Sequence, residues 1–480
     1  MAVTEVAATE MAATEAAGWQ ATHRGLSELD LRFREAAKDS PELLDRARFR
    51  LLYEGSEGSE GSEGSKLLRF PLQPWPTFVG AEKLAEIRRV SIEVCRLLRG
   101  VPERIFEHDP VKLAEFYRLP SPAIAEILFA PPTGADTALA RGDLIETAAG
   151  FQCIELNFSP SLAGWDGTII TNLQLAAPPT ARFMAGEGVK PAFTDTLLEM
   201  FRFVIEDIRG KGVAGAGGLT IALLPDRKET AVIAEQLEYL NRELRRTLAA
   251  MGLDARGRLV GCLPEQLAFQ GGRLLLGAQQ IDGVLELGGT PTPPHIYRPF
   301  KAGLIGLYNG PMDAILSDKR NLALLSLHAA TAGYSPEEQA FIAAHVPWTR
   351  LVAPGAIDWE GKTHSLAELL AAEQPRFVLK KAGGHGGSGV VLGKFAAPER
   401  WREALATALR EGDWVVQETL QSLPYLYQSG DYGCSIHDVI WGPFVFGNRY
   451  GGVVLRMQPA AAGGPVNLTL HATEGIVLEV

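Results

Sequence analysis

Apolar residues recur at helical spacing in several parts of the chain and predict helices that bury one face. The clearest patterns lie at 192–209 and at 230–251. In the second, acidic residues come early and arginines come late, which suits the helix dipole. Weaker helical patterns lie at 27–53, 81–100, 110–117, 121–129, 318–328 and 397–410, and Ser335-Pro-Glu-Glu338 predicts a further helix start.

Short apolar runs bounded by Gly and Pro predict strands. A buried strand is expected at 217–225, and three short strands with a Gly271-Gly272 turn are expected over 259–287. A strand, loop and second strand follow at 377–392. The β-rich remainder of the chain predicts strands at 414–418, 444–446, 453–457 and 475–480.

These changes of pattern divide the chain into five parts. The strand–helix–strand order over 213–310 predicts a small α/β domain. Residues 54–65 are four copies of Glu-Gly-Ser, which predicts a flexible insertion of no assignable function. The five parts are a disordered tail at 1–26, a mainly helical region at 27–138 that contains this insertion, a segment with two strands at 139–212, the α/β domain at 213–310 and a final α and β region at 311–480.

Composition and charge narrow the function classes. The chain has 480 residues, 46% of them hydrophobic and 21% charged, as in ordinary globular proteins. A net charge of −11 without a basic stripe argues against a nucleic-acid partner. The four cysteines lack metal-ligand spacing, and neither a membrane span nor a signal peptide is evident, so a cytoplasmic protein is expected.

A glycine-rich loop is the first stretch with candidate chemistry. The sequence Phe377-Val-Leu-Lys-Lys-Ala-Gly-Gly-His-Gly-Gly-Ser-Gly-Val390 joins two strands through five glycines. Backbone without Cβ atoms can surround an anion with its N–H groups, and a lysine at the end of the strand adds positive charge. It is not a P-loop, because its lysines precede the glycines. The loop alone fits a phosphate site or a plain glycine hairpin equally well.

A second stretch predicts a β-hairpin with polar residues on one face. Arg141-Gly-Asp-Leu-Ile-Glu-Thr-Ala-Ala-Gly-Phe-Gln-Cys-Ile-Glu-Leu-Asn157 contains two strands around a turn at 148–150. A turn centred on Ala149 places Asp143 opposite Glu155 and Arg141 opposite Asn157. These four side chains then share a face, with Ile154 and Leu156 buried on the other.

Converging carboxylate and amide oxygens suit Mg²⁺, which prefers oxygen ligands together with substrate phosphates. Arg141 beside them could stabilise a phosphoryl group during transfer. An exposed hairpin with a cross-strand ion pair is the alternative. The apolar neighbours Phe151, Leu156 and Phe158 favour the metal site, because buried polar groups need partners.

Together the two stretches resemble ATP-grasp enzymes. Arg141-x-Asp143…Glu155-x-Asn157-x-Ser-Pro160 is similar to the Arg-x-Asp…Glu-x-Asn-x-Ser/Thr-Pro signature of the D-alanine–D-alanine ligase branch. Lys380 and the glycines at 383–389 resemble that family's loop over the ATP phosphates. Trp414-Val-Val-Gln-Glu418 resembles the hinge strand that meets the adenine.

The order of these motifs differs from the usual family. Here the Glu-x-Asn strand precedes the loop by about 220 residues, which resembles circularly permuted ATP-grasp proteins of the glutathionylspermidine synthase type. Two further segments resemble that group: Tyr308-Asn-Gly-Pro-Met-Asp-Ala-Ile-Leu-Ser-Asp-Lys319 and Asn448-Arg-Tyr-Gly-Gly-Val-Val-Leu-Arg456. The resemblance covers roughly residues 70–480. It implies a permuted ATP-grasp fold of the α+β or α/β class, in which 213–310 is the pre-ATP-grasp domain and 311–480 holds the nucleotide-binding subdomains.

The resemblance implies roles for individual residues. Asp143, Glu155 and Asn157 would bind Mg²⁺, and Arg141 would contact the transferred phosphoryl group. Arg456 would hold phosphate or the substrate carboxylate, with a cross-strand salt bridge as the alternative. Arg298 would contact substrate, although an ion pair at a domain interface is an alternative. Lys381 is an alternative to Lys380, since adjacent strand residues point to opposite faces. The ATP-binding residues would be Lys319, Lys380, Gly383, Gly384, Gly386, Gly387, Ser388, Gly389, Gln417 and Glu418.

The implied activity is an ADP-forming ligase that joins a carboxylate to an amine through an acyl phosphate, using ATP and Mg²⁺. The partners would be small-molecule or peptide substrates, with no nucleic acid or membrane. One alternative is an ATP-dependent phosphotransferase on the same scaffold, for which His385 in the loop is a candidate. Another is a non-catalytic ATP-grasp-like binding protein. Neither substrate nor the oligomeric state can be inferred from the sequence.

Overall fold

The computed structural model describes eleven stretches of the chain. The predicted tail at 1–26 and the Glu-Gly-Ser insertion at 54–65 lie outside them. The described residues are 28–38, 70–129, 138–158, 164–176, 178–212, 218–225, 230–287, 292–384, 389–429, 433–468 and 472–480.

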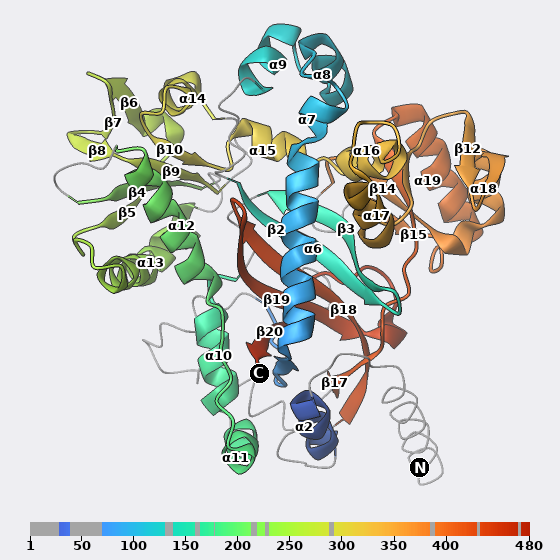
Figure 1. Ribbon diagram of the computed structural model, residues 1–480, viewed down its shortest axis with the longest axis horizontal. Coiled ribbons are helices and arrows are strands. Elements are labelled where there is room, and N and C mark those ends of the chain that lie inside the picture. Colours follow the sequence, from blue (N-terminus) through green and yellow to red (C-terminus); the bar gives the residue numbers. More distant parts are fainter. Residues whose placement is uncertain are drawn as a thin grey trace.

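A seven-stranded sheet forms the centre of the molecule (Figure 1). Its strand order is β1-β20-β19-β18-β2-β3, and β17 pairs with part of β18. All pairs are antiparallel except β1 with β20. Strands from both ends of the sequence therefore lie side by side. Their bounds are β1 Thr77–Val79, β2 Leu139–Thr147, β3 Gly150–Phe158, β17 Tyr425–Ser429, β18 Gly433–Phe446, β19 Arg449–Pro459 and β20 Thr473–Glu479.

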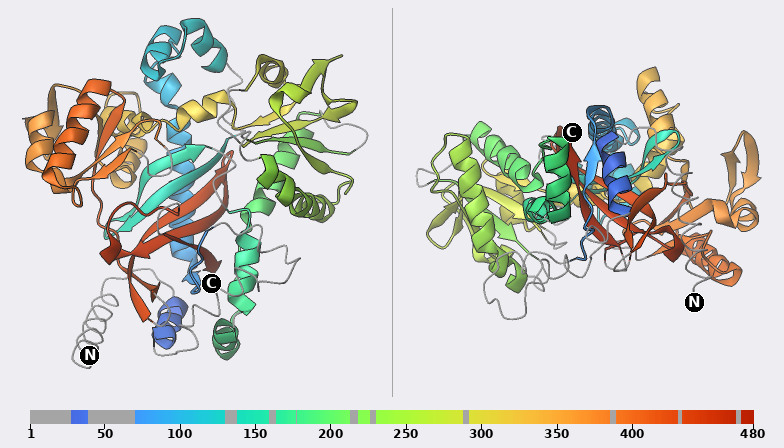
Figure 2. Two further views of the ribbon diagram at one scale, coloured as in Figure 1. Left: turned by 180° about the vertical axis from the view of Figure 1, so that it is seen from behind. Right: turned by 90° about the horizontal axis from the view of Figure 1, so that it is seen from below.

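The long helix α6 (Ala81–Arg99) crosses one face of this sheet (Figure 1). Its apolar residues, among them Ile87, Val90 and Val94, are fully buried with strand residues such as Leu144 and Leu455 in the largest core. Seen from behind, the sheet lies in front of α6 (Figure 2). One face of the sheet is therefore packed against α6, and the opposite face lies between the two flanking parts of the molecule.

A charged network is buried on the α6 face. The Lys83 amine of α6 donates to the Glu146 carboxylate of β2 at 2.6 Å, and the Tyr425 hydroxyl donates to the same carboxylate. At the sheet edge, α2 (Glu28–Lys38) carries the fully buried pair Arg34–Asp30, whose members contact two strands: Asp30 accepts from Phe78 N at 2.8 Å and Arg34 donates to the Leu426 carbonyl. Buried charges need such partners, because desolvation of a lone ion is costly.

The predicted α/β domain contains a separate parallel sheet of order β10-β9-β4-β5. Helix α12 (Thr196–Gly210) packs against it with α13 (Thr230–Ala250) and also reaches Phe444 and Val454 of the central sheet. Strands β6 to β8 form an additional antiparallel meander, so the region 259–287 holds five strands where three were predicted. The bounds are β4 Thr220–Leu224, β5 Arg258–Gly261, β6 Leu267–Gln270, β7 Arg273–Leu276, β8 Gln279–Ile281, β9 Gly283–Glu286, α14 Pro294–Lys301 and β10 Gly306–Tyr308.

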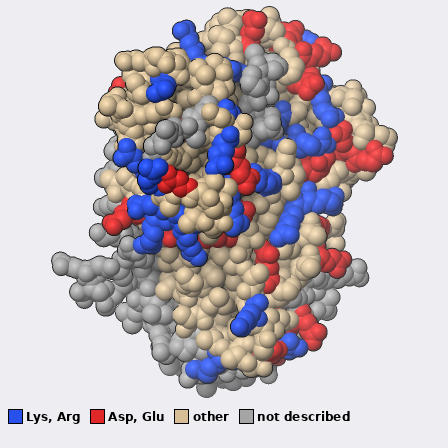
Figure 3. All heavy atoms as spheres, turned by 60° about the vertical axis from the view of Figure 1, so that its left-hand side comes forward, with Lys and Arg blue, Asp and Glu red and all other residues tan. Residues whose placement is uncertain are grey.

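Charges of both signs cover this side of the molecule. Figure 3 turns the left-hand side of Figure 1 forward, where α12 and α13 lie, and shows Lys and Arg side chains among Asp and Glu. Arg202 pairs with Glu199 at 2.6 Å on α12, and Arg246 pairs with Glu243 at 3.4 Å on α13. Arg202 and Arg246 are thus each matched by a carboxylate one turn away.

The third unit is an antiparallel sheet of order β11-β16-β14-β15, packed with α18 and α19 around its own core. It lies beside β3, on the side of the central sheet opposite the parallel sheet (Figure 1). The glycine-rich loop joins β14 to β15. The bounds are α15 Pro311–Leu316, α16 Arg320–His328, α17 Pro336–His345, β11 Thr349–Leu351, β12 Ala356–Trp359, β13 Lys362–Ser365, α18 Leu366–Ala372, β14 Phe377–Lys381, β15 Val390–Leu392, α19 Pro398–Glu411 and β16 Trp414–Glu418.

The helices predicted at 81–100, 110–117 and 121–129 are confirmed, whereas the predicted helical pattern beyond Lys38, at 39–53, lies outside the described residues. After α6 come α7 (Val101–Arg104), α8 (Pro110–Tyr117) and α9 (Pro122–Phe129), which lie at one end of the molecule in Figure 1. Asp109 caps α8 by accepting hydrogen bonds from two backbone N–H groups. Helices α10 (Gly167–Ala176) and α11 (Pro178–Glu187) follow the hairpin. Among the described helices, none is long and apolar enough to cross a membrane.

Candidate functional site

The hairpin of β2 and β3 has the predicted pairing, but its turn differs from the predicted one. Asp143 lies opposite Glu155, and Arg141 lies opposite Asn157. The turn is a two-residue turn between Thr147 and Gly150, not one centred on Ala149. By itself that turn would put Asp143 opposite Ile154.

A bulge at Ile154 restores the predicted pairing. Leu144 pairs with Cys153 while Asp143 pairs with Glu155, so Ile154 is the extra residue. Ile154 is only half-buried, contrary to the prediction that it packs on the second face, whereas Leu156 is 3% exposed. Without the bulge, Glu155 would point toward α6 on the opposite face from Asp143.

The polar residues of the hairpin lie on the sheet face away from α6. Glu146 points to Lys83 of α6, so Asp143 and Arg141, at odd positions of the same strand, point the other way. Gly442 of β18 leaves room for Arg141, since a Cβ there would lie 3.0 Å from Arg141 Cδ. The site is therefore built on rigid strands, with space for a long cationic side chain.

Asp143 is held by two arginines from different strands. Arg141 Nε lies 3.2 Å from Asp143 Oδ1, and Arg456 Nη2 of β19 lies 2.5 Å from the same oxygen. Burial by itself would raise the pKa of Asp143, but Arg456 and then Arg141 lower it below its ordinary value. The carboxylate is therefore ionised in the folded protein, and Arg456 forms an ion pair across the sheet with Asp143.

Glu474 is a member of this cluster that the sequence did not indicate. It lies opposite Arg456 in the register of β19 and β20 and is 1% exposed. Burial, and then the neighbouring Asp166, raise the pKa of Glu474 well above its ordinary value, against the opposing effect of Arg141 and Arg456. Glu474 immediately precedes the apolar run predicted as a strand at 475–480, so no motif marked it.

Lys319 approaches the hairpin from the segment between β10 and α16. Its amine lies 3.1 Å from Glu155 Oε1 and also donates to the Gly384 carbonyl at the start of the glycine loop. Asn309 and Ser317 anchor this segment to the hairpin strands, because Asn309 exchanges two hydrogen bonds with the Leu139 backbone and Ser317 accepts one from Phe158 N. Lys319 is only 5% exposed, so its side chain does not project into solvent from the start of α16.

The two lysines of β14 face in opposite directions. The Lys380 amine is buried and donates to Gln417 Oε1 at 2.7 Å and to the Ile154 carbonyl at 3.1 Å. Lys381 instead reaches Glu411 on α19, at 3.1 Å. Burial lowers the pKa of Lys380 to about 8. Of the two lysines, Lys380 is therefore the one directed at the hairpin, and the bulge provides the carbonyl that it contacts.

Of the other residues predicted to bind ATP, some lie beside Lys380 and others point elsewhere. Gln417 is buried and donates to Thr349 Oγ1 at 3.0 Å, so it orients Lys380 through its other atom. Glu418 points to Arg376, at 3.2 Å. Gly383, Gly384 and Gly389 are described, and Lys381 N donates to the Gly389 carbonyl. Gly386, Gly387 and Ser388 lie outside the described residues, as does His385.

Arg298 is the predicted site residue that the structure does not bring to the cluster. It is exposed on α14, which packs against β6 and β10. Within the described part of the chain, no hydrogen bond or ion pair joins Arg298 to the hairpin.

The donor set has the chemistry for a hard cation but is already neutralised by the protein. Asp143 and Glu155 are opposed carboxylates with the Asn157 amide on the same face, and Mg²⁺ in such sites takes its remaining ligands from phosphate and water. Among the described residues no group of three His, Cys, Asp or Glu side chains could hold a metal by itself. Two carboxylates and an amide therefore fit Mg²⁺ only in company with a ligand such as a phosphate.

Comparison with known proteins finds a similar fold among solved structures. No family model matches the chain, and no curated protein matches it. Among solved structures it is similar to a glutathione synthetase-like effector from Globodera pallida, solved in its apoform. The TM-score is 0.55 at 11% sequence identity, and the match covers 92% of this chain and 99% of that chain.

At this identity the likeness concerns the fold alone. It agrees with the prediction of a mixed α/β protein related in fold to ATP-grasp ligases, and the circular permutation stays a prediction. The chain therefore has a glutathione synthetase-like fold, in which four buried or nearly buried cations, Arg141, Lys319, Lys380 and Arg456, surround a pair of opposed carboxylates.

Proposed function

We propose that the protein is an ATP- and Mg²⁺-dependent ligase that joins a carboxylate to an amine and forms ADP. The observation that carries the proposal is the meeting of Lys319 and Lys380 with the Asp143–Glu155 hairpin, from segments more than 150 residues apart in the sequence. Buried cations beside opposed carboxylates suit a polyphosphate with its metal.

Each group of residues in the site would have a separate role in this reaction. Lys380 and Lys319 would neutralise phosphate oxygens, and Gln417 would hold Lys380 in place. Arg141 and Arg456 would stabilise the charge that spreads over the phosphoryl group in transfer. Asp143, Glu155 and Asn157 would hold Mg²⁺, which draws charge from the phosphate oxygens.

The proposed chemistry has two steps. An oxygen of the substrate carboxylate attacks the γ-phosphorus, the bond to the β-phosphate oxygen breaks, and ADP leaves with that electron pair. The amine nitrogen then attacks the carbonyl carbon, phosphate leaves with the C–O electron pair, and the nitrogen loses a proton. The acyl phosphate must be shielded from water between the steps, which suits the buried position of Lys319, Lys380 and Asp143.

ADP release with panels of acids and amines tests this proposal. We expect release to require both substrates, and we expect Glu155→Ala to reduce the rate by a factor of about 100 or more, since it removes a metal ligand. Lys381→Ala is the matched control, because Lys381 points away to Glu411. Full turnover of Glu155→Ala would refute the metal role.

Phosphorus NMR of the products separates the alternatives. A ligase yields ADP and inorganic phosphate with an amide, whereas a phosphotransferase yields a phosphorylated product without an amine. A binding protein would take up nucleotide without turnover. The last alternative has one observation in its favour, since Asp143 is already neutralised by two arginines.

A further inference from the structure

Both carboxylates among the three candidate metal ligands of the hairpin are paired with cations of the protein. Arg456 and Arg141 contact one oxygen of Asp143, at 2.5 and 3.2 Å, and Lys319 contacts Glu155 at 3.1 Å. All of these side chains are at most about one-fifth exposed. The pairs are therefore poorly screened by solvent.

These contacts oppose binding of a metal ion alone. A divalent ion at Asp143 and Glu155 would lie within a few ångströms of Lys319 and Arg456, and charges of the same sign repel strongly in a buried site. Lys319 cannot simply withdraw, because its backbone N–H donates to the Ala382 carbonyl and its amine also contacts Gly384. Lys319 would therefore release Glu155 only if another anion took the place of that carboxylate.

A nucleotide phosphate is such an anion. Lys380, only 6% exposed and directed at the same hairpin, adds a further positive charge that neither carboxylate contacts directly. A polyphosphate would accept contacts from Lys319 and Lys380 and would release Glu155 for the metal. Metal and nucleotide would then each raise the affinity for the other, since coupling between two ligands is reciprocal.

We propose that Lys319, before nucleotide binds, occupies Glu155 as a resident counter-ion, so that the divalent metal binds together with the nucleotide and not ahead of it. Arg456 has the same role toward Asp143. This inference rests on the proposed function, since it concerns the same site, but it makes a separate claim about the order of binding.

Mn²⁺ binding, followed by electron paramagnetic resonance, tests the claim without turnover. The wild-type protein should bind Mn²⁺ weakly alone. With ADP it should bind Mn²⁺ at least about tenfold more tightly, after correction for the Mn²⁺ that ADP binds in solution. Lys319→Met should bind Mn²⁺ alone about tenfold more tightly than wild type, because Glu155 is released. In this variant, ADP should raise the affinity for Mn²⁺ by a smaller factor than in wild type.

Two variants separate the role of charge from that of packing. Lys319→Arg keeps a cation beside Glu155 and should retain weak binding of Mn²⁺ alone. Lys381→Met removes an adjacent lysine that contacts Glu411 instead, and it should match wild type in every measurement. Thermal unfolding of each variant confirms that it is folded.

The inference is overturned if wild type binds Mn²⁺ alone as tightly as with ADP, or if Lys319→Met leaves the affinity for Mn²⁺ alone unchanged. Failure of the proposed function gives a different result. If ATP and ADP do not bind wild type under any condition, the ligase proposal fails, while the comparison of wild type with Lys319→Met in Mn²⁺ alone still decides the counter-ion role.

Discussion

At the scale of single residues, the buried lysine Lys380 has the most distinctive environment. Burial lowers its pKa to about 8, and the charged groups around it are Glu155, Lys319 and Asp143, together with the Cys153 thiol. Lys380 carries its positive charge below that pKa and loses it above. Its partners Gln417 and the Ile154 carbonyl are neutral, so its charge is available to an anionic ligand.

The affinity for nucleotide should therefore fall as the pH rises through and above about 8. Bound phosphate will stabilise the charged form and shift the midpoint upward. Titration of a fluorescent ADP analogue between about pH 7 and about pH 9.5 measures this effect. Lys380→Arg should bind without this pH dependence because a guanidinium stays charged.

Lys381→Arg is the matched control for that titration, and it should keep the wild-type pH profile because Lys381 contacts Glu411 outside the cluster. A flat wild-type profile over the same range would show that the charge of Lys380 does not contribute to binding.

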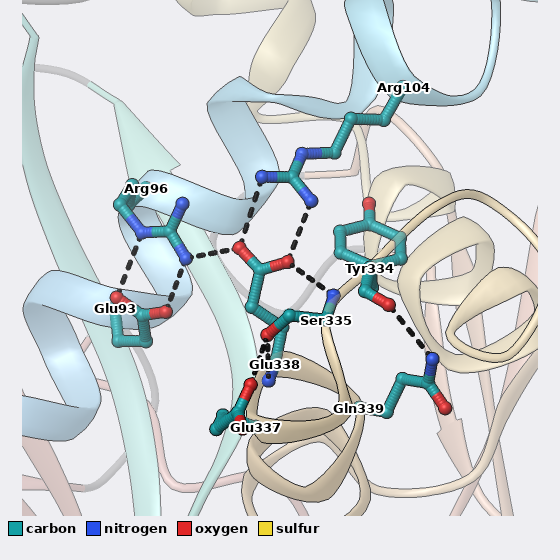
Figure 4. Close-up of polar contacts among 8 residues, drawn as sticks. All are labelled: Glu93, Arg96, Arg104, Tyr334, Ser335, Glu337, Glu338 and Gln339. Carbon is teal, nitrogen blue, oxygen red and sulfur yellow. Dashed lines mark hydrogen bonds and ion pairs between the residues drawn. The ribbon is translucent and has the colours of Figure 1, made fainter.

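At the scale of elements, the start of α17 joins the unit that contains the glycine-rich loop to α6 and α7 (Figure 4). Ser335 and Glu338 form a capping box, as the sequence Ser-Pro-Glu-Glu predicted. Glu338 also contacts Arg104 at 2.7 Å and Arg96 at 2.6 Å. These arginines and the Ser335 N–H lower the pKa of Glu338 to about 2, against the opposing effect of burial.

Glu338→Ala should destabilise the protein by about 2 kcal/mol, because it removes a cap and two charged hydrogen bonds. Glu337→Ala is the matched control one residue earlier. Glu337 contacts only the Ser335 hydroxyl among the residues drawn in Figure 4, and its removal should change stability by less than about 0.5 kcal/mol. Chemical denaturation compares the two.

The same carboxylate predicts a pH dependence of stability. Its pKa is lower in the folded protein than in the unfolded chain, so its stabilisation is present above the ordinary pKa of 4.5 and is lost as the pH falls from there toward about 2. The difference in stability between wild type and Glu338→Ala should shrink over that window. An unchanged difference in acid would contradict the assignment.

At the scale of the whole molecule, Asn309 connects the parallel sheet to the central sheet. Its amide group exchanges hydrogen bonds with both the N–H and the carbonyl of Leu139, two residues before Arg141. It also adopts a left-handed backbone conformation with φ of 58°, which Asn tolerates better than most residues. The segment that delivers Lys319 begins at this junction.

Asn309→Ala should lower the free energy of unfolding by about 2 to 3 kcal/mol, from two lost hydrogen bonds and added backbone strain. Asn309→Gly loses the same bonds without the strain and should be about 1 kcal/mol more stable than the alanine variant. Denaturant unfolding of both variants measures the two contributions. Equal stability of both variants would refute the strain component.

Much of the local structure was predictable from the sequence. The helices at 81–99, 196–210 and 398–411 and the strands at 377–381 and 414–418 lie where periodicity and turn residues indicated. These elements are determined by local patterns of burial. The Gly271-Gly272 turn joins β6 to β7 as predicted, but only three of the five strands between 258 and 286 were predicted, because these strands are short and separated by turns of few residues.

The sequence by itself indicated most of the residues that meet at the candidate site, namely Arg141, Asp143, Glu155, Asn157, Lys319, Lys380 and Arg456, but it also indicated Arg298, which lies elsewhere. The tertiary structure alone decided how they meet. The bulge at Ile154 places Glu155 on the same face as Asp143, and the packing of β14 against β16 directs Lys380 inward and Lys381 outward. It also brought in Glu474, which no motif marks. The physical reason is that residue type and spacing are local, whereas the facing of a side chain depends on strand register, which is set by partners far away in the chain.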